Sequence, residues 1–233
     1  MSVARGKDYV EVVYSREHWI LLERLRSKAR KLLECLAMQG VYGIVHGSIA
    51  RGDVHPGSDI DVFVPYPVNY LLVIESLERC NEKIYRITVV QATPSYVPKV
   101  YLEIDPYGQG IVSFPLGDLS RGEREFYKWG GELVLADLRR GTRVPGVNKD
   151  LLLIIPTEEG HREIPVKGNE YLAARMTGVS LETVQERVNI LSARREKGST
   201  GLFLKEVLPG DADISSVIDE IKRRNPFFRK RVE

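Results

Sequence analysis

The chain has 233 residues, of which 43% are hydrophobic and 28% are charged, and its formal net charge is +2. This composition excludes an intrinsically disordered chain and predicts a folded protein with a buried core. No apolar run approaches the roughly 20 residues that cross a bilayer, and the N-terminal sequence lacks the apolar segment of a secretory signal. We therefore expect no membrane partner, a cytoplasmic location, and reduced structural thiols at Cys35 and Cys80.

The first half of the chain alternates helical and extended patterns. Apolar residues at three- and four-residue steps predict an amphipathic helix from Arg16 to about Met38. The β-branched run Val41 to Val45 predicts a strand that ends in His46-Gly47-Ser48. Strict alternation from Asp59 to Val64 predicts a half-buried strand that carries two carboxylates on one face.

Further elements follow before residue 126. Tyr70 to Glu82 has helical spacing, and three more runs have the composition of strands: Ile84 to Val90, Lys99 to Asp105, and Gly110 to Phe114. The last two are joined by the turn sequence Pro-Tyr-Gly-Gln. This mixture predicts an α/β or α+β fold with a mixed sheet.

A shift in composition predicts a second, smaller and mainly helical domain. Gly130-Gly131 and the basic stretch Arg139 to Gly146 suit a boundary, so we expect domains at residues 1–140 and 141–233. Leu151 to Ile155 predicts a buried strand. Asn169 to Met176 and Ser180 to Arg195 predict two helices separated by a turn at Gly178.

This helix pair resembles a helix-turn-helix, because Gly178 allows the turn and Ser180 suits the N-cap of the second helix. Arg187 departs from that pattern, since an apolar residue is expected there, and an ordinary pair of antiparallel helices is an equal alternative. The chain ends in a basic cluster with Phe227 and Phe228, which could contact a phosphate backbone and stack on bases. We therefore expect nucleic acid as a partner of the C-terminal domain.

Two neighbouring motifs carry the chemistry. Asp59 and Asp61 lie two residues apart on one predicted strand, so their carboxylates share a face and can ligate Mg²⁺ or Mn²⁺. One strand earlier, Gly47 permits a close backbone approach to a ligand and Ser48 supplies a hydroxyl, so both suit the binding of phosphate. Arg51 has a planar fork of donors that can also bind phosphate.

The run Gly47-Ser48-Ile49-Ala50-Arg51-Gly52-Asp53, leading to Ser58-Asp59-Ile60-Asp61-Val62, resembles the motif of the DNA polymerase beta-like nucleotidyltransferase superfamily, which includes archaeal CCA-adding enzymes and minimal nucleotidyltransferases. The resemblance covers about Val41 to Val64. It implies a mixed sheet backed by helices and metal-dependent attack of an acceptor hydroxyl on the α-phosphate of a nucleoside triphosphate, with release of pyrophosphate. It also implies that Gly47 and Ser48 bind the triphosphate and that Asp59 and Asp61 hold the metal ions.

The resemblance implies a third carboxylate on a later strand, and two alternatives remain for it. If the strand that ends at Asp105 is the matching one, Glu103 and Asp105 share a face, and Asp105 is the preferred third ligand. If the matching strand is Gly110 to Phe114, its face offers Ser113, which has no acid group. In that case the protein would bind nucleotide without transferring it well.

Three functional hypotheses follow. The leading one is an enzyme that transfers a nucleoside monophosphate to an acceptor hydroxyl, with RNA among the candidate acceptors. The second is a nucleic-acid-binding regulator whose N-terminal domain senses nucleotide with weakened catalysis. The third is a nucleotidyltransferase that modifies a protein hydroxyl.

Overall fold

The computed structural model describes residues 9–198 and 201–232. Contacts divide the chain into two compact units, and each unit is discontinuous in sequence. The described residues of unit 1 fall within Met1–Arg26, His46–Pro56 and Glu125–Ser199, and those of unit 2 within Ser27–Val45, Gly57–Arg124 and Thr200–Glu233. The expected boundary at residue 140 lies inside the segment Glu125–Ser199 of unit 1, so it does not separate the two units.

The long helix predicted near the N-terminus is confirmed as α1 (Arg16–Ala37). Its buried residues recur at helical spacing, because one stripe of the helix faces the core. They are Leu22, Leu25, Ala29, Leu32, Leu33 and Leu36. The helix begins in unit 1 and ends in unit 2.

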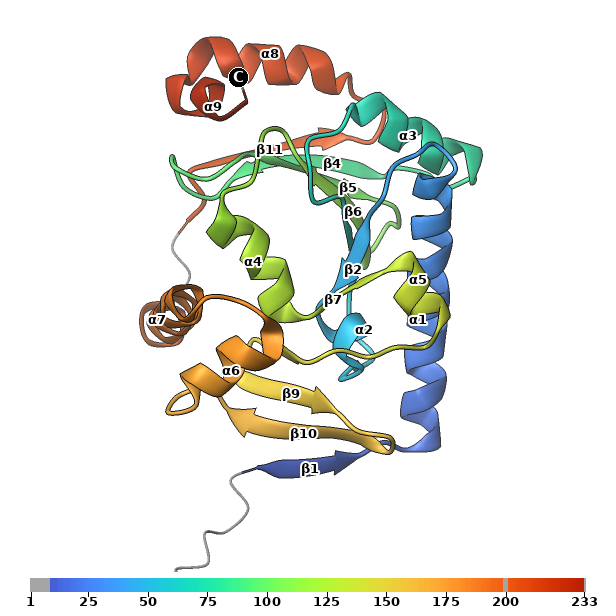
Figure 1. Ribbon diagram of the computed structural model, residues 1–233. Coiled ribbons are helices and arrows are strands. Elements are labelled where there is room, and N and C mark those ends of the chain that lie inside the picture. Colours follow the sequence, from blue (N-terminus) through green and yellow to red (C-terminus); the bar gives the residue numbers. More distant parts are fainter. Residues whose placement is uncertain (1–8, 199–200, 233) are drawn as a thin grey trace, which may run out of the picture. The chain divides into compact units, whose positions relative to one another are not determined.

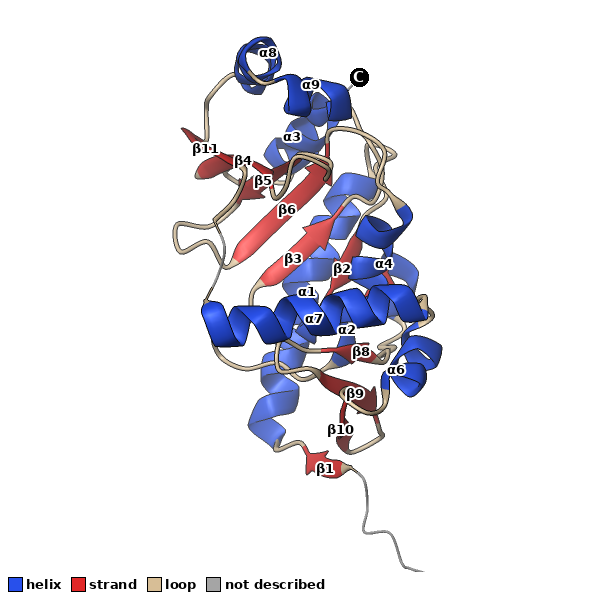
Figure 2. Ribbon diagram, turned by 90° about the vertical axis from the view of Figure 1, so that its left-hand side faces the viewer, coloured by secondary structure: helices blue, strands red, loops and turns tan. Residues whose placement is uncertain are grey.

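Unit 2 is built on a mixed sheet with the strand order β11-β4-β5-β6-β3-β2 (Figure 1). Its strands are β2 (Ile44–His46), β3 (Ile60–Phe63), β4 (Arg86–Gln91), β5 (Lys99–Glu103), β6 (Gly110–Pro115) and β11 (Leu204–Pro209). Strands β3 and β6 are parallel, as Figure 2 shows side by side, whereas β4, β5 and β6 are antiparallel neighbours. The sheet is therefore mixed, as predicted, and β3, which contains Asp61 and directly follows Asp59, is paired on both sides.

A disulfide joins Cys35 of α1 to Cys80 at the end of α3 (Tyr70–Arg79). The expectation of two reduced thiols is wrong in this structure. The cysteines are 45 residues apart in sequence, so no local spacing pattern reveals the pair. They meet only because α1 and α3 bring them together, with 6.1 Å between their Cα atoms.

The C-terminal segment belongs to unit 2 rather than to a separate domain. Strand β11 pairs antiparallel with β4 from Leu204 opposite Gln91 to Pro209 opposite Arg86, so it extends the sheet that carries β3. Two helices follow it, α8 (Ile214–Arg224) and α9 (Pro226–Val232). This long-range pairing explains why the predicted domain 141–233 is not one unit, since a sequence pattern does not reveal which edge a late strand joins.

Unit 1 contains a second sheet with the order β1-β10-β9-β8. Its strands are β1 (Val10–Val13), β8 (Gly146–Val147), β9 (Leu152–Pro156) and β10 (Gly160–Pro165). Its remaining elements are α2 (Ser48–Arg51), most of α4 (Arg121–Gly130), β7 (Glu132–Val134), α5 (Leu135–Arg139), α6 (Glu170–Thr177) and α7 (Leu181–Lys197). The predicted smaller part thus combines helices with a sheet.

The helix pair α6 and α7 packs on a core that contains Trp129, Leu153 and Val184. Gly178 ends α6 in the left-handed conformation, and the Ser180 side chain caps α7 by accepting from the amide of Thr183 at 3.2 Å. The two predicted helices and their turn are therefore present. The helix-turn-helix function remains a prediction.

The fold is α+β: a mixed sheet with helices, together with a second, antiparallel sheet and further helices. Among the helices of residues 9–198 and 201–232, none combines the length and hydropathy that crossing a bilayer requires.

Candidate functional site

The acidic pair lies at and just before strand β3. Asp59 directly precedes the strand and is exposed, and Asp61 is half-buried within it. Ile60 and Val62 are buried on the opposite face, so the alternation predicted from the sequence is confirmed. The amide of Ile60 donates to the carbonyl of Gln109 at 2.6 Å and joins the start of β3 to the residue before β6. The two carboxylates therefore project from one face of a well-anchored strand.

The strand register identifies the residues that share this face. Asp61 pairs with Ile111 of β6, and Ile111 pairs with Glu103 of β5. Side chains at paired positions of neighbouring strands point to the same side of a sheet. Asp61, Ile111 and Glu103 thus form one row across the acidic face, and the next row contains Ser113 and Tyr101.

Two ionisable side chains of β5 are perturbed on this face. Burial raises the pKa of Tyr101 to about 12, and the negative charge of Asp61 adds to the effect. Burial lowers the pKa of Lys99, and the carboxylate of Glu123 partly opposes that change. Asp61 and Tyr101 therefore lie on the same face of the sheet, close enough for the carboxylate to disfavour the phenolate.

Each candidate for the third carboxylate has partners outside the acidic pair. Asp105 lies beyond β5, in the turn to β6, where its carboxylate accepts from the amides of Tyr107, at 2.8 Å, and Gly110. Glu103 does share the face with Asp61, but both of its oxygens accept from the guanidinium of Arg86, one of them at 2.8 Å. Asp105 thus anchors the hairpin, and its role as the third metal ligand remains a prediction.

Asp59 and Asp61 are the two carboxylates that could ligate a metal ion at this site. Within the described ranges, no group of three or more His, Cys, Asp or Glu side chains is arranged to hold a metal ion. The predicted set Asp59, Asp61 and Asp105 is therefore not assembled. Paired hard oxygens still suit Mg²⁺ or Mn²⁺, which commonly complete their coordination with waters and substrate phosphates. The donor chemistry thus fits a site that the substrate completes.

The Gly47–Gly52 loop lies in unit 1 and contains the short helix α2. Gly47 and Gly52 have φ angles of 79° and 109°, which favour glycine because a Cβ is strained there. The amide of Gly47 donates to the carbonyl of Gly131 at 2.9 Å, and the amide of Gly52 closes the loop on the carbonyl of Ser48 at 2.6 Å. Ser48 is therefore the first residue of a compact helical turn. Gly47 and Gly52 flank this turn, because the backbone adopts a conformation at both positions that favours glycine.

Arg26 and His18 of α1 hold this loop, and sequence analysis did not assign either residue a role. The Arg26 guanidinium is buried and donates to the carbonyl of Ile49 at 3.0 and 3.1 Å and to that of Ala50 at 3.2 Å. His18 contacts the carbonyl of Gly52 through Nε2 at 2.8 Å. A cation at the carboxyl end of α2 is favourable because the last carbonyls of a helix are electronegative. An arginine within a buried helical stripe was the signal that could have identified Arg26.

Arg51 has a structural role in this loop. Its Nε and Nη2 each donate to the carboxylate of Asp53 at 2.9 Å, and its Nη1 donates to the carbonyl of Gly130 at 2.6 Å. The side chain is only 6% exposed. Its fork of donors is engaged by Asp53 and Gly130 in this structure, and its contact with phosphate remains a prediction. The sequence could not reveal this, since Gly130 is distant along the chain.

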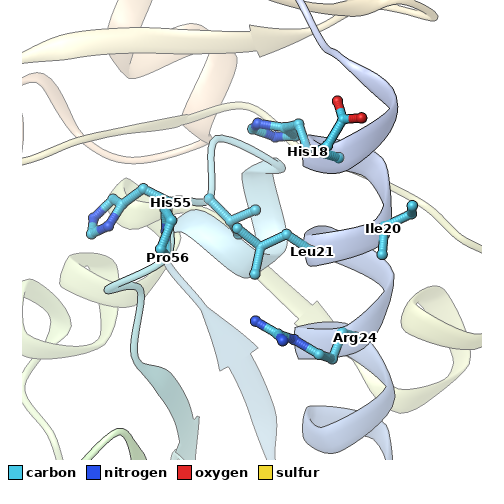
Figure 3. A pocket seen from close by; sticks show the side chains of 8 residues that line it. His18, Ile20, Leu21, Arg24, His55 and Pro56 are labelled. Carbon is cyan, nitrogen blue, oxygen red and sulfur yellow. The ribbon is translucent and has the colours of Figure 1, made fainter.

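A surface pocket of about 460 Å³ lies elsewhere in unit 1, between α1 and the segment after the loop (Figure 3). His18, Leu21 and Arg24 project from α1 toward His55 and Pro56 in this view. Its lining contains none of the predicted nucleotide-binding or metal-binding residues.

Comparisons with known proteins place the acidic pair and the Gly47–Gly52 loop within one matched segment. Residues 25–111 match the family model described as a nucleotidyltransferase domain. A solved structure, described as "Structural Plasticity of Cid1 Provides a Basis for its RNA Terminal Uridylyl Transferase Activity", matches with 21% identity and a TM-score of 0.30. The match covers 44% of this chain and 32% of that chain, a likeness too slight to carry a function over. A comparison with curated proteins gives no match. Residues 25–111 of this chain, which include Gly47, Ser48, Asp59 and Asp61, are therefore similar to a nucleotidyltransferase domain.

Proposed function

We propose that this domain binds a nucleoside triphosphate together with Mg²⁺ or Mn²⁺ at Asp59 and Asp61, and that it transfers the nucleoside monophosphate to an acceptor hydroxyl. The observation that carries the proposal is the pair of carboxylates on one face of β3, inside the segment that matches a nucleotidyltransferase domain. Paired carboxylates at this spacing hold a divalent ion against phosphate oxygens. Gly47 and Ser48, in the same matched segment, are proposed to bind the triphosphate.

The proposed reaction is a displacement at the α-phosphorus. The acceptor oxygen forms a bond to that phosphorus, the bond to the bridging oxygen breaks, and pyrophosphate leaves with the electron pair. The proton of the acceptor hydroxyl passes to solvent. A bound divalent ion supplies neutralisation of the phosphate charge, and Asp59 and Asp61 are the residues that would hold it.

The test uses the full chain with each α-labelled nucleoside triphosphate, Mg²⁺ or Mn²⁺, and separate RNA, DNA and protein acceptors. The unmodified chain should label one acceptor class. Asp59→Asn and Asp61→Asn should abolish labelling, because each removes a charged ligand with little change in volume. Asp211→Asn, which changes an exposed aspartate of the turn before α8, is the matched control. Undiminished labelling by the Asp59 and Asp61 variants would refute the assignment.

A second candidate is favoured by the strand beside β3. Ser113 occupies the acidic face of β6, and no acid side chain lies on that face of β6. A domain that lacks an acid there would bind nucleotide and transfer it slowly, as a sensor in a regulatory protein would. Metal-dependent nucleotide binding, measured by equilibrium dialysis, without label in any acceptor would select this function. Turnover with any acceptor would select the transferase.

A further inference from the structure

The last described residues carry an unusual density of positive charge. Six Lys and Arg residues and no acidic residue lie in the eleven residues from Lys222 to Val232. These eleven residues span the last turn of α8, Asn225 and all of α9. In the described part of the chain, only Arg224 among these six forms an ion pair, with Glu206 and Glu220. The other five charges are left for a ligand or for solvent.

A helix cap and a buried side chain hold α9 in place, so these charges have a defined arrangement. The Asn225 side chain caps the helix by accepting from the amides of Phe227 and Phe228, each at 3.1 Å. Phe228 is fully buried and anchors the helix in unit 2. The carbonyl oxygen of Arg231 would lie 2.2 Å from a Cβ at Gly117, so the end of α9 packs closely on the loop after β6.

Two aromatic rings accompany the charges. Phe227 is 57% exposed and Phe203 is 38% exposed, and their rings meet edge to face with centroids 5.9 Å apart. The sequence pointed to Phe227 and Phe228, but the burial of Phe228 leaves Phe203, from the start of the β11 segment, as the second ring. On α9, Lys230 and Arg231 follow Phe227 by three and four residues, a spacing that shares one helix face.

We propose that these side chains form a binding surface for single-stranded nucleic acid, which we call the α8–α9 surface: Phe203, Phe227, Arg223, Lys230 and Arg231. Figure 1 shows α8 and α9 over the β11–β4 end of the sheet. Cations beside exposed aromatic rings match a chain of phosphates that carries unpaired bases. Paired bases present no free faces to the two rings, so a duplex binds less tightly.

An anionic membrane is the chief competing ligand for a basic helix, and the burial pattern argues against it. A helix that lies in a membrane interface needs a continuous exposed apolar face. The apolar residues of α8, Ile214, Ile218 and Ile221, are instead buried in unit 2. Phe228 is buried in the same way. The exposed rings suit stacking on bases better than insertion into lipid.

The test measures binding of the full chain to a fluorescent 20-mer of oligouridylate, to a 20-base-pair duplex, and to vesicles that contain phosphatidylserine. The single strand should bind most tightly, and its affinity should fall steeply with salt. Arg223→Ala/Lys230→Ala/Arg231→Ala should reduce the slope of log affinity against log salt by about 2, since each phosphate contact contributes about 0.7. The matched control removes three exposed cations elsewhere: Lys28→Ala/Lys83→Ala/Lys149→Ala.

The aromatic part of the surface has its own test. Phe227→Ala should weaken single-strand binding about tenfold, whereas Phe227→Trp should retain it, because any aromatic face can stack on a base. Tyr107→Ala removes the ring of another highly exposed aromatic residue and is the control. Thermal unfolding of each variant verifies that the fold is kept.

Three outcomes would overturn the proposal: single-strand binding that the triple substitution and Phe227→Ala leave unchanged, preferential binding to vesicles, or no binding to the oligonucleotide at low salt. The proposal does not rest on nucleotidyl transfer. Binding without transfer supports the α8–α9 surface alone, and transfer that these variants do not affect supports the catalytic assignment alone.

Discussion

Ser113 of β6 lies in register beside Phe63 of β3, and the parallel pairing directs its side chain to the sheet face that carries Asp61. Ser113 is only 5% exposed, and its hydroxyl lies 3.5 Å from the carbonyl oxygen of Val62. The strand next to the acidic pair therefore offers a hydroxyl, which corresponds to the alternative in which the third acid is absent. This arrangement predicts slow transfer by the unmodified chain.

An acid at position 113 should speed the reaction. If the third carboxylate belongs at this position of β6, Ser113→Asp supplies a further metal ligand. The transfer rate should then rise by about tenfold or more, since a tenfold change corresponds to only about 1.4 kcal/mol of transition-state stabilisation. Steady-state kinetics, with the acceptor that the labelling experiment identifies, measure the change in transfer rate. Ser113→Asn is the control, because it has the same shape and no charge.

The same substitution has a thermodynamic consequence. A buried carboxylate near Asp61 adds desolvation and like-charge repulsion, so Ser113→Asp should lower the melting temperature without metal. Mn²⁺ should restore more of that loss than it does for Ser113→Asn. A rate and a metal response equal to those of the asparagine variant would exclude position 113 from the metal site.

Glu103 and Asp105 should respond differently to loss of charge. Asp105→Asn removes one acceptor from the two amides at the hairpin, so it should cost about 1 kcal/mol of stability while the rate per folded molecule is kept. Glu103→Gln keeps the fold but changes a carboxylate in the row of Asp61, and should lower the rate if any acid of β5 assists transfer. Transfer rates normalised to the folded fraction compare the two. If Asp105→Asn lowers the transfer rate more than Glu103→Gln does, Asp105 is the third metal ligand.

These contrasts show where sequence reasoning succeeds and where it ends. Local periodicity sufficed for α1 and β3, because one face of each is buried and the pattern repeats along the chain. It could not decide between Asp105 and Ser113, since that choice depends on which strand pairs with β3. The pairing of Cys35 with Cys80 depends in the same way on contacts distant in sequence.

Arg51 should prove structural. Arg51→Lys cannot reproduce the two-pronged contact with Asp53 and also reach the carbonyl of Gly130, so unfolding should become easier by about 3 kcal/mol, as for other broken buried pairs. Denaturant unfolding measures the loss, and Asp53→Asn should cause a similar one. A double-mutant cycle should show that the two losses are not additive. If the Arg51→Lys variant is as stable as the unmodified chain but binds nucleotide more weakly, Arg51 contacts the phosphates of the nucleotide instead.

The disulfide should contribute to the stability of unit 2. It closes a loop of 45 residues, and a loop of that length corresponds to about 4 kcal/mol from restricted unfolded-chain entropy. Dithiothreitol should therefore lower the melting temperature of the unmodified chain but not that of Cys35→Ser/Cys80→Ser. Mass spectrometry with a thiol-alkylating reagent verifies that the bond was present beforehand. Alkylation of both cysteines in the untreated, denatured protein would contradict the pairing.

Tyr101 should make the fold sensitive to alkali. Its pKa rises from 10.0 to about 12 because burial and the charge of Asp61 disfavour the phenolate. The unfolded chain therefore releases this proton near pH 10 while the folded protein retains it. The resulting stability is fully present below pH 10 and is lost as the pH rises toward 12.

The measurement is the free energy of unfolding in denaturant at several pH values between 9 and 12. The unmodified chain should lose more stability over this interval than Tyr101→Phe, which has no phenolic proton to release. Tyr107→Phe is the control, because that ring is 86% exposed and its substitution should leave the pH dependence as it is in the unmodified chain. If Tyr101→Phe and the unmodified chain lose stability in parallel, the Tyr101 hydroxyl is not held in a buried position beside Asp61. The acidic face would then be open to water, and binding of nucleotide there would depend more strongly on salt.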